Sequence, residues 1–385
     1  MQWDGEVLLL NTDSNNIFKR PDLSLIICTL NEGAAIANVV NEICDTLSGI
    51  DYEIVVVDDD STDNTGAEVL RVAEENSRVR LYVRHNEKGL SSAAIKGWDI
   101  AQGRILGIMD GDGQHDPHAI RQLADIILKG DKDLVCVSRY LGKSDTGLSF
   151  GRDIASRLAT KATHLVLKAP LSDPMSGCFM MTRDWYETAR PNLTGVGFKI
   201  LVDLVASTKV KPRFAEVKAA LRQRQGGESK LDLRVILDLG ALLVEKGTGG
   251  LLPARFVLFA AVGMSGVVIS ALILTIFKLL GYSTVAEFGH AQIVAIGLAM
   301  VWNFFLNNIL TFRDHRLKGF GPILKGLIVF CLVCTPGAIL NWWIGILLKS
   351  AQVEFILAGV IPAFLIGILN YWASRVLAWN QKKGS

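Results

Sequence analysis

The sequence predicts an α/β domain with a mostly parallel sheet, followed by an all-α transmembrane domain of four helices. Up to about residue 250, short apolar runs alternate with segments of helical spacing, and this alternation is typical of a parallel sheet covered on both faces. Residues 256–379 are mostly apolar and carry few charges. The mean hydropathy of +0.32 therefore averages two different halves of the 385-residue chain.

Charge and cysteine content exclude two classes of site. The formal net charge is only +2, and no basic cluster interleaved with aromatic residues occurs, so the sequence gives no reason to expect nucleic acid binding. The six cysteines are scattered. Cys331 and Cys334 form a Cys-x-x-Cys pair without the second ligand pair that a zinc site needs. We interpret the cysteines as small buried apolar residues in a reducing compartment.

Strands and helices alternate after an N-terminal extension, residues 1–21, which resembles neither a signal peptide nor a spanning helix. Strands are expected at residues 24–30, 53–57, 79–83, 105–109 and 134–137, and helices at residues 34–47, 90–102 and 118–129. Asp116 followed by Pro117 predicts the start of the last of these helices. In such folds, ligands bind beyond the carboxyl ends of the strands.

The fourth expected strand ends abruptly in carboxylates. Asp110 and Asp112 are two residues apart, so they share a face if the chain stays extended. Gly111 and Gly113 allow the backbone to approach a ligand closely. Two carboxylates with the Gln114 amide suit Mg²⁺ or Mn²⁺, which takes further ligands from water and substrate phosphates. The alternative is an acidic, glycine-rich surface turn.

Two other strand ends carry polar clusters, Thr29-Leu-Asn-Glu32 and Asp58-Asp-Asp-Ser-Thr-Asp63. Carboxylates gathered at one sheet edge repel each other, so they require a compensating cation or several hydrogen-bond donors. No Gly-x-Gly-x-x-Gly follows the first strand, and no complete Gly-x-x-x-x-Gly-Lys-Ser/Thr element is present. The sequence therefore disfavours a dinucleotide-binding fold and a P-loop NTPase.

Six motifs, in order, resemble the GT-A glycosyltransferases (glycosyltransferase family 2) typified by dolichyl-phosphate mannose synthase. They are Thr29-Leu-Asn-Glu32, Val56-Val-Asp-Asp-Asp-Ser61, Asp110-Gly-Asp-Gly-Gln-His115, Ser138-Arg-Tyr140, Asp173-Pro-Met-Ser-Gly177 and Gly227-Glu-Ser-Lys230. The resemblance covers residues 23–230, and we expect the transferase domain at residues 22–230. It departs at Cys28 and Leu30, where many relatives carry proline and tyrosine. The Gln-x-x-Arg-Trp signature of processive polysaccharide synthases is absent, which favours transfer of a single sugar.

The resemblance implies a donor site and an acceptor site. The donor residues are Thr29, Glu32, Val57 and Asp59 at the nucleoside, Asp110, Gly111, Asp112 and Gln114 at the metal and diphosphate, and Lys199, Arg224 and Lys230 beside the diphosphate. The acceptor residues, which receive the phosphate of the lipid or of the transferred sugar, are Arg139, Arg152 and Ser156. Guanidinium groups suit this task because they hold phosphate oxygens in a fixed fork. Asp173 either orients the acceptor, assists as a base or only forms a loop.

Residues 231–254 present an apolar face that Asp232, Arg234 and Asp238 interrupt. A helix lying in the membrane interface and a helix packed on the transferase domain both fit this pattern.

Four spans are expected at residues 256–280, 292–312, 323–348 and 355–379, each long enough for a bilayer of about 30 Å. Lys and Arg gather before the first span, between the second and third, and after the fourth. The other two loops hold Glu287 and Glu354 and little positive charge. The catalytic domain and both termini are therefore expected on the cytoplasmic side of the membrane.

The spans repeat in pairs. The segment from Phe259 parallels that from Phe330, and the segment from Asn303 parallels that from Asn370. This arrangement resembles the GtrA-like membrane domain, expected at residues 255–385. Hydrogen bonds between helices, or a lipid headgroup site, are the alternatives for Asn303, Asn307, Asn308 and Asn370.

Together with these features, the resemblance to the GT-A family implies an inverting, metal-dependent transferase. It would move one hexose, mannose or glucose, from GDP-mannose or UDP-glucose to a dolichyl or undecaprenyl phosphate on the cytoplasmic leaflet. A phosphate monoester is already anionic at neutral pH, so the reaction needs no strong general base. A homo-oligomer is compatible with the sequence. The alternative is a lipid-linked sugar translocator or membrane scaffold with an inactive transferase domain, which the intact Asp110-x-Asp112-x-Gln114 set disfavours.

Overall fold

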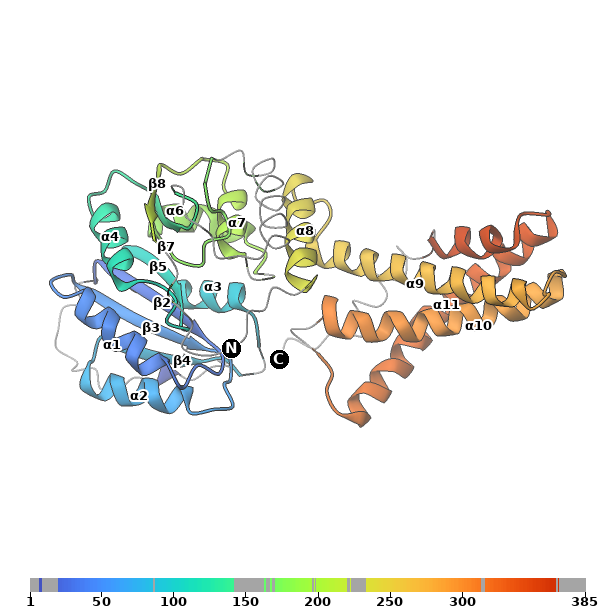
Figure 1. The fold of residues 1–385 in the computed structure, drawn as a ribbon, viewed down its shortest axis with the longest axis horizontal. Coiled ribbons are helices and arrows are strands. Elements are labelled where there is room, and N and C mark those ends of the chain that lie inside the picture. Colours follow the sequence, from blue (N-terminus) through green and yellow to red (C-terminus); the bar gives the residue numbers. More distant parts are fainter. Residues whose placement is uncertain are drawn as a thin grey trace. The chain divides into compact units, whose positions relative to one another are not determined.

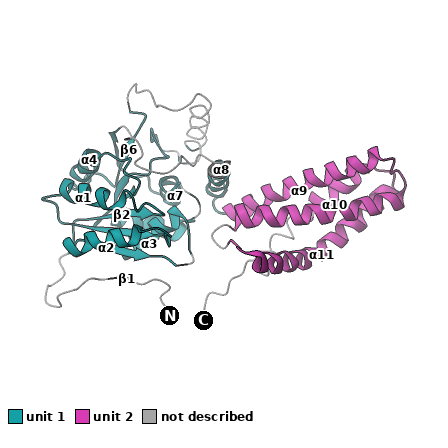
Figure 2. Ribbon diagram, turned by 60° about the horizontal axis from the view of Figure 1, so that its bottom comes forward, with its two compact units in different colours: residues 1–250 teal, residues 251–385 magenta. Residues whose placement is uncertain are grey.

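The computed structural model describes residues 7–8, 20–85, 87–141, 163, 167, 170–195, 197, 199–219, 222, 233–312, 316–364 and 366. The chain divides into two compact units, unit 1 (Met1–Gly250) and unit 2 (Leu251–Ser385), which Figure 2 distinguishes by colour. Unit 1 has α/β architecture, and unit 2 consists of apolar helices.

Unit 1 is built on an eight-stranded sheet of order β1-β4-β3-β2-β5-β7-β6-β8 (Figure 1). The strands are β1 (Val7–Leu8), β2 (Leu23–Thr29), β3 (Tyr52–Asp58), β4 (Val79–Val83), β5 (Ile105–Asp110), β6 (Leu134–Ser138), β7 (Phe179–Thr182) and β8 (Phe214–Lys218). β2 runs parallel to β3 and β5, β3 to β4, and β6 to β8. β7 runs antiparallel to β5 and β6. The expectation of a mostly parallel sheet is confirmed.

Helices cover both faces of this sheet. They are α1 (Ile36–Thr46), α2 (Thr65–Glu75) and α4 (Pro117–Ile127) on one face, and α3 (Leu90–Ile100), α6 (Arg183–Ala189) and α7 (Ile200–Ser207) on the other (Figure 1). A short 3₁₀ helix, η1 (Arg190–Asn192), links α6 to the loop before α7. Alternate side chains of β2 enter the two cores, Leu25 and Ile27 on the first face, Ile26 and Cys28 on the second.

The last helix of unit 1, α8 (Leu233–Gly247), packs on the second core. Leu239 and Leu242 are buried there, and Lys246 Nζ lies 2.8 Å from Asp203 Oδ1 on α7. Ile236 remains exposed. Of the two alternatives for this segment, these contacts support the helix packed on the transferase domain.

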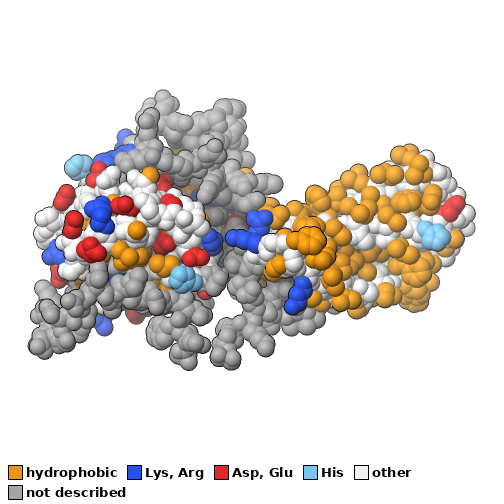
Figure 3. Space-filling model, turned by 90° about the horizontal axis from the view of Figure 1, so that it is seen from below, with side chains coloured by type: hydrophobic (Ala, Val, Ile, Leu, Met, Phe, Trp, Pro, Cys, Tyr) orange, Lys and Arg blue, Asp and Glu red, His pale blue; other side chains and the backbone are white. Residues whose placement is uncertain are grey.

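Unit 2 contains three helices long and apolar enough to cross a membrane, among the residues described. They are α9 (Ala254–Leu279), α10 (Val285–Leu306) with its π-helical extension η2 (Asn307–Thr311), and α11 (Phe320–Ser350). A shorter apolar helix, Phe355–Phe364, begins the fourth expected span, most of which lies outside the described residues. Hydrophobic side chains cover the face of unit 2 seen in Figure 3, as lipid contact requires.

α10 begins seven residues before the predicted span at Gln292. The cause is a capping box. Thr284 Oγ1 accepts a hydrogen bond from the Glu287 backbone N–H, and the Glu287 carboxylate accepts one from the Thr284 N–H. The prediction places the start of this span where the apolar residues begin. It therefore misses the first turns of the helix, whose start is fixed by polar residues.

The polar residues of unit 2 differ from expectation. Asn308 bonds both backbone groups of Leu317 in the loop before α11, and Asn307 accepts from Thr311 within η2, so neither joins two helices through these bonds. Asn303 Oδ1 is buried without a hydrogen-bond partner in the part of the chain described, and Asn370 lies outside that part. Among the described residues, Gln292 of α10 does join two helices, because its side-chain amide donates to Asn341 of α11.

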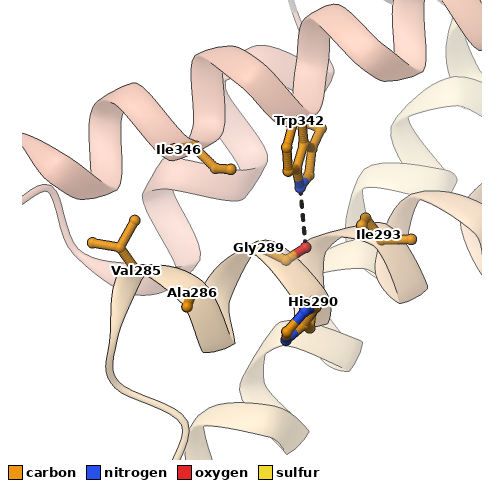
Figure 4. A pocket seen from close by; sticks show the side chains of 7 residues that line it. All are labelled: Val285, Ala286, Gly289, His290, Ile293, Trp342 and Ile346. Carbon is orange, nitrogen blue, oxygen red and sulfur yellow. Dashed lines mark hydrogen bonds between the residues drawn. The ribbon is translucent and has the colours of Figure 1, made fainter.

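A pocket of about 500 Å³ lies between α10 and α11 (Figure 4). Trp342 Nε1 donates to the Gly289 carbonyl across it at 3.1 Å. The other side chains that line it, except that of His290, are apolar.

Candidate functional site

The metal-binding loop predicted from the sequence follows β5 directly. Asp110 is the last residue of the strand, and Asp112 is buried in the turn beyond it. The Gln114 N–H donates to Asp112 Oδ1 at 3.1 Å. Asp116 then caps α4 by accepting from the His118 N–H, as Asp-Pro at this position predicts. The loop is therefore held between a strand end and a helix cap.

Two glycines leave room around Asp110. A Cβ on Gly177, just before β7, would lie 2.8 Å from Asp110 Oδ2. A Cβ on Gly111 would lie 2.8 Å from the Thr29 methyl group. Since such contacts are too short for real Cβ atoms, side chains here would displace the carboxylate and its neighbouring strand end.

His115 and Arg222 also belong to this loop, although neither is among the predicted site residues. His115 Nε2 lies 3.6 Å from Asp110 Oδ2 and is buried. The Arg222 N–H donates to the Gln114 carbonyl at 2.9 Å, and the Gln114 side-chain amide points to the Arg222 carbonyl at 3.5 Å. His115 ends the motif Asp110-Gly-Asp-Gly-Gln-His115, so the sequence could have identified it as a site residue. No local sequence pattern predicts the role of Arg222, because its partner Gln114 lies 108 residues away in the sequence.

The end of β3 lies beside the loop before α3. Asp59 Oδ1 accepts from Arg84 Nε at 2.7 Å, and Oδ2 accepts from the Gly89 N–H at 2.7 Å. Burial raises the pKa of the Asp59 carboxyl, against the opposing effects of the Gly89 N–H and the Arg84 charge. Arg84 directly follows β4 and is itself buried, so the rule that selects residues at strand ends would have found it.

The remaining predicted nucleoside residues lie at neighbouring strand ends. Thr29 ends β2, and its hydroxyl donates to Asp58 at 3.0 Å. Val57 is paired within β3 with its side chain buried. The Glu32 N–H donates to the Thr65 hydroxyl at the start of α2. The sheet thus brings Thr29, Val57 and Asp59 to one edge, with Glu32 in the following turn.

Arg139 follows β6 and forms a two-pronged ion pair with Asp173. Arg139 Nε lies 2.6 Å from Asp173 Oδ2, and Nη2 lies 2.9 Å from Oδ1. The guanidinium also lies over the Tyr140 ring, 5.5 Å from its centroid. Burial alone would lower the pKa of Arg139, but the bonds to Asp173 and its charge raise it, so the group stays cationic.

Lys199 lies just before α7 in the same charged cluster. Burial lowers the pKa of its ammonium, and the Arg139 charge lowers it further, while Asp110 and Asp173 oppose this shift. Cations and carboxylates from four separate chain segments therefore act on each other here. Four other predicted residues, Arg152, Ser156, Arg224 and Lys230, lie outside the described residues.

The residues of the loop fit a divalent cation that shares its ligands with a substrate. Among the described residues, no group of three or more His, Cys, Asp or Glu forms a complete protein cage. Asp110, Asp112 and Gln114 offer hard oxygens, and Gly177 leaves space beside Asp110. Mg²⁺ and Mn²⁺ typically combine a few such oxygens with waters and substrate phosphates.

Comparisons with known proteins match both halves of the chain. The family Glycosyl transferase family 2 matches residues 24–190, and the family GtrA/DPMS, transmembrane domain matches residues 258–379. A dolichol-phosphate mannosyltransferase of Pyrococcus furiosus is 32% identical over 362 residues, covering 93% of this chain and 99% of its own. Proteins of the same name from Mycosarcoma maydis and Saccharomyces cerevisiae are 37% and 36% identical, covering 54% and 48% of this chain and 71% of their own.

A solved structure of glucosyl-3-phosphoglycerate synthase from Mycobacterium tuberculosis, in complex with Mn²⁺, UDP and glucosyl-3-phosphoglycerate, is more distant. It covers 59% of this chain and 80% of its own, at 18% identity and a TM-score of 0.47. Similarity at this level identifies neither the donor nor the metal of the present chain.

Proposed function

We propose that the chain transfers one hexose from a nucleotide sugar to a polyprenyl phosphate. It matches glycosyl transferase family 2 and, further along, the GtrA/DPMS transmembrane domain, and it belongs to the family of the Pyrococcus furiosus dolichol-phosphate mannosyltransferase. The hexose is mannose or glucose, from GDP-mannose or UDP-glucose. The names of three relatives favour mannose. The acceptor is a dolichyl or undecaprenyl phosphate at the cytoplasmic leaflet.

One observation carries this proposal. Carboxylates and cations lie at the same edge of the sheet, with Asp110 close enough to Arg139 and Lys199 for their charges to interact. A site that joins two phosphate-bearing substrates needs both negatively and positively charged side chains. Carboxylates hold a metal on the diphosphate, while arginine and lysine hold phosphate oxygens.

In the donor site, we assign Glu32 and Asp59, with Thr29 and Val57, to the nucleoside end. Asp59 acts there partly through its bonds to Arg84 and Gly89, which fix the loop before α3. Asp110, Asp112 and Gln114 would hold Mg²⁺ or Mn²⁺, with Gly111 keeping the loop close to Thr29. When bound, the metal neutralises charge on the leaving diphosphate. The basic residues assigned beside that diphosphate are Lys199, Arg224 and Lys230.

In the acceptor site, we assign Arg139 to the lipid phosphate, together with Arg152 and Ser156. The phosphate oxygen attacks the anomeric carbon as the diphosphate leaves, and a single displacement of this kind inverts the configuration. Alignment by the two sites supplies most of the rate enhancement, since the nucleophile is already ionised. The protein chain needs only to orient the two substrates and to exclude water.

The apolar helices of unit 2 place the chain in a membrane, and the acceptor is a lipid. We propose that unit 1 and both termini are cytoplasmic, because the described loop between α10 and α11 carries Arg316 and Lys318, with Lys325 near the start of α11. At the opposite helix ends, Lys278 is paired with Glu354.

Purified full-length protein should be incubated with undecaprenyl or dolichyl phosphate and a panel of radiolabelled nucleotide sugars, including GDP-mannose and UDP-glucose. The proposal expects label from one donor to enter the organic phase as a single monosaccharide released by mild acid. Addition of several sugars to one lipid would contradict single transfer. Lipid-linked sugar that crosses vesicle membranes without any transfer would favour the translocator alternative.

A further inference from the structure

Asp173 is fully buried, and its carboxylate holds the Arg139 guanidinium in an ion pair. Its two oxygens accept from Arg139 Nε at 2.6 Å and Nη2 at 2.9 Å, and Oδ2 also accepts from the Arg139 backbone N–H at 3.3 Å. A carboxylate that takes one whole edge of a planar guanidinium fixes the direction of the other atoms in that plane.

The backbone around Asp173 is itself anchored. The preceding residue, Ser172, donates its N–H and its hydroxyl to Glu216 on β8, at 2.8 Å and 3.0 Å. Its hydroxyl also lies 2.5 Å from that of Ser138, the last residue of β6. The Asp173 carbonyl accepts from Ser176 in the following turn. The backbone at Asp173 is therefore anchored to two strands by contacts that do not involve Arg139.

The negative charge of Asp173 offsets the repulsion between two neighbouring cations. The Arg139 charge lies close enough to Lys199 to disfavour its ammonium, and both cations lose hydration by burial. Asp173 attracts both. Without an anion at this position, two neighbouring cations would repel each other before any phosphate arrives.

The same geometry is unsuited to proton transfer. Asp173 has no exposed surface, and both of its oxygens are occupied by a strong cationic donor. A general base needs to reach the proton that it abstracts. The lipid phosphate proposed as nucleophile carries no proton that must be removed at neutral pH.

We propose that Asp173 is a positioning residue, which orients the Arg139 guanidinium for the acceptor phosphate and does not act as a base. This inference rests on the proposed function, because it assumes that Arg139 meets the lipid phosphate.

The test compares Asp173→Asn, Arg139→Gln and the double variant in the full-length protein, with farnesyl phosphate as the acceptor and the donor identified by the panel. Asp173→Asn should raise the acceptor KM by about ten-fold or more, since Asp173 is buried and losing its charge releases the Arg139 guanidinium, while donor affinity without acceptor changes little. In the double variant, the acceptor KM should match that of Arg139→Gln alone, because Asp173 acts through Arg139.

Asp133→Asn is the matched control. Asp133 lies at the other end of β6 and forms the same two-pronged pair with Arg213, at 3.0 Å and 2.7 Å. Its loss should leave the acceptor KM unchanged. If Asp173→Asn unfolds, the double variant is used in its place, because it removes both charges. Its acceptor KM is then compared with that of Arg139→Gln.

Three results would overturn this role. A loss of about 10²-fold or more in kcat with an unchanged acceptor KM would make Asp173 a base. Independent, additive effects of the two substitutions would separate Asp173 from Arg139. A lowered melting temperature with an unchanged acceptor KM would reduce Asp173 to a structural role. A wild-type chain that transfers no sugar to any lipid phosphate is a different failure, because it overturns the proposed function and this role with it.

Discussion

Arg139 is the residue whose substitution distinguishes the proposed acceptor site from the proposed donor site. In Arg139→Lys the charge remains, but the planar fork that pairs with Asp173 is lost. We expect affinity for the lipid phosphate to fall about ten-fold or more, at roughly 1.4 kcal/mol per decade. Donor affinity, which we assign to the carboxylates after β5, should change little. The acceptor KM and the donor Kd measured without acceptor check this.

The competing assignment places Arg139 on the donor diphosphate. It predicts the reverse pattern, a large loss of donor binding with an unchanged acceptor KM.

Lys199 gives the site a pH dependence whose sign follows from its surroundings. Burial, and then the Arg139 charge, lower the pKa of the ammonium from its ordinary 10.5, so it loses its proton at lower pH than an exposed lysine does. Asp110 and Asp173 oppose this shift. If the ammonium binds the donor diphosphate, donor affinity should fall as pH rises through the lowered pKa.

The control is Lys199→Arg, whose guanidinium stays charged throughout this range. Its donor affinity should persist to higher pH than that of the wild type. Identical alkaline profiles for the two proteins would remove Lys199 from the diphosphate.

At the scale of elements, the turn that leads into β7 lies against Asp110 at the end of the neighbouring strand β5. In Gly177→Ala, the new methyl group would lie 2.8 Å from Asp110 Oδ2, so the carboxylate has to move. Since Asp110 is a proposed metal ligand, we expect Mn²⁺ affinity to fall by about ten-fold, as when a supporting group of a metal site is lost. Mn²⁺ titration followed by electron paramagnetic resonance measures this.

Gly107→Ala is the contrasting variant in β5. Its methyl group would meet Leu25 at 2.9 Å and Met180 at 3.2 Å, within the sheet core. It should lower the melting temperature and spare Mn²⁺ affinity. Equal Mn²⁺ affinity in Gly177→Ala and the wild type would show that Asp110 does not bind the metal in this position.

The elements that the sequence predicts well are those whose own pattern determines them. The strands β2 to β6 are apolar runs bounded by polar turns, and Asp116 with Pro117 marks the start of α4. β7 and β8 are absent from the prediction because β7 has four residues and β8 only one fully buried side chain. Their places depend on pairing with β5 and β6, which no local pattern records.

The same limit applies within the site. Carboxylates at strand ends are detectable because parallel strands end at one edge, which is why Thr29, Asp59 and Asp110 come together. The partners that hold them are not local. Asp173 lies 34 residues from Arg139 in sequence, and Arg222 lies 108 residues from Gln114. Only the folded chain shows these contacts.

At the scale of the whole molecule, charge predicts the orientation in the membrane. Lys318 is exposed in the segment between α10 and α11, on the side proposed to be cytoplasmic. In a variant with Lys318→Cys in a background without other reactive cysteines, a membrane-impermeant maleimide should label inverted vesicles and not intact cells. A cysteine at Ser283, between α9 and α10, should show the opposite pattern. Labelling of Lys318→Cys from outside only would overturn the topology.

The proposed reaction is metal-assisted sugar transfer at the carboxylates after β5. The most direct measurement is the transfer of labelled mannose or glucose to polyprenyl phosphate by the wild type with Mg²⁺ or Mn²⁺, with EDTA, and by Asp112→Asn. Asp125→Asn, which changes a surface carboxylate on α4, is the control. We expect transfer by the wild type and by the control, none in EDTA, and a loss of about 10²-fold or more in Asp112→Asn with its fold intact. Full turnover in EDTA, or by Asp112→Asn, would contradict the account.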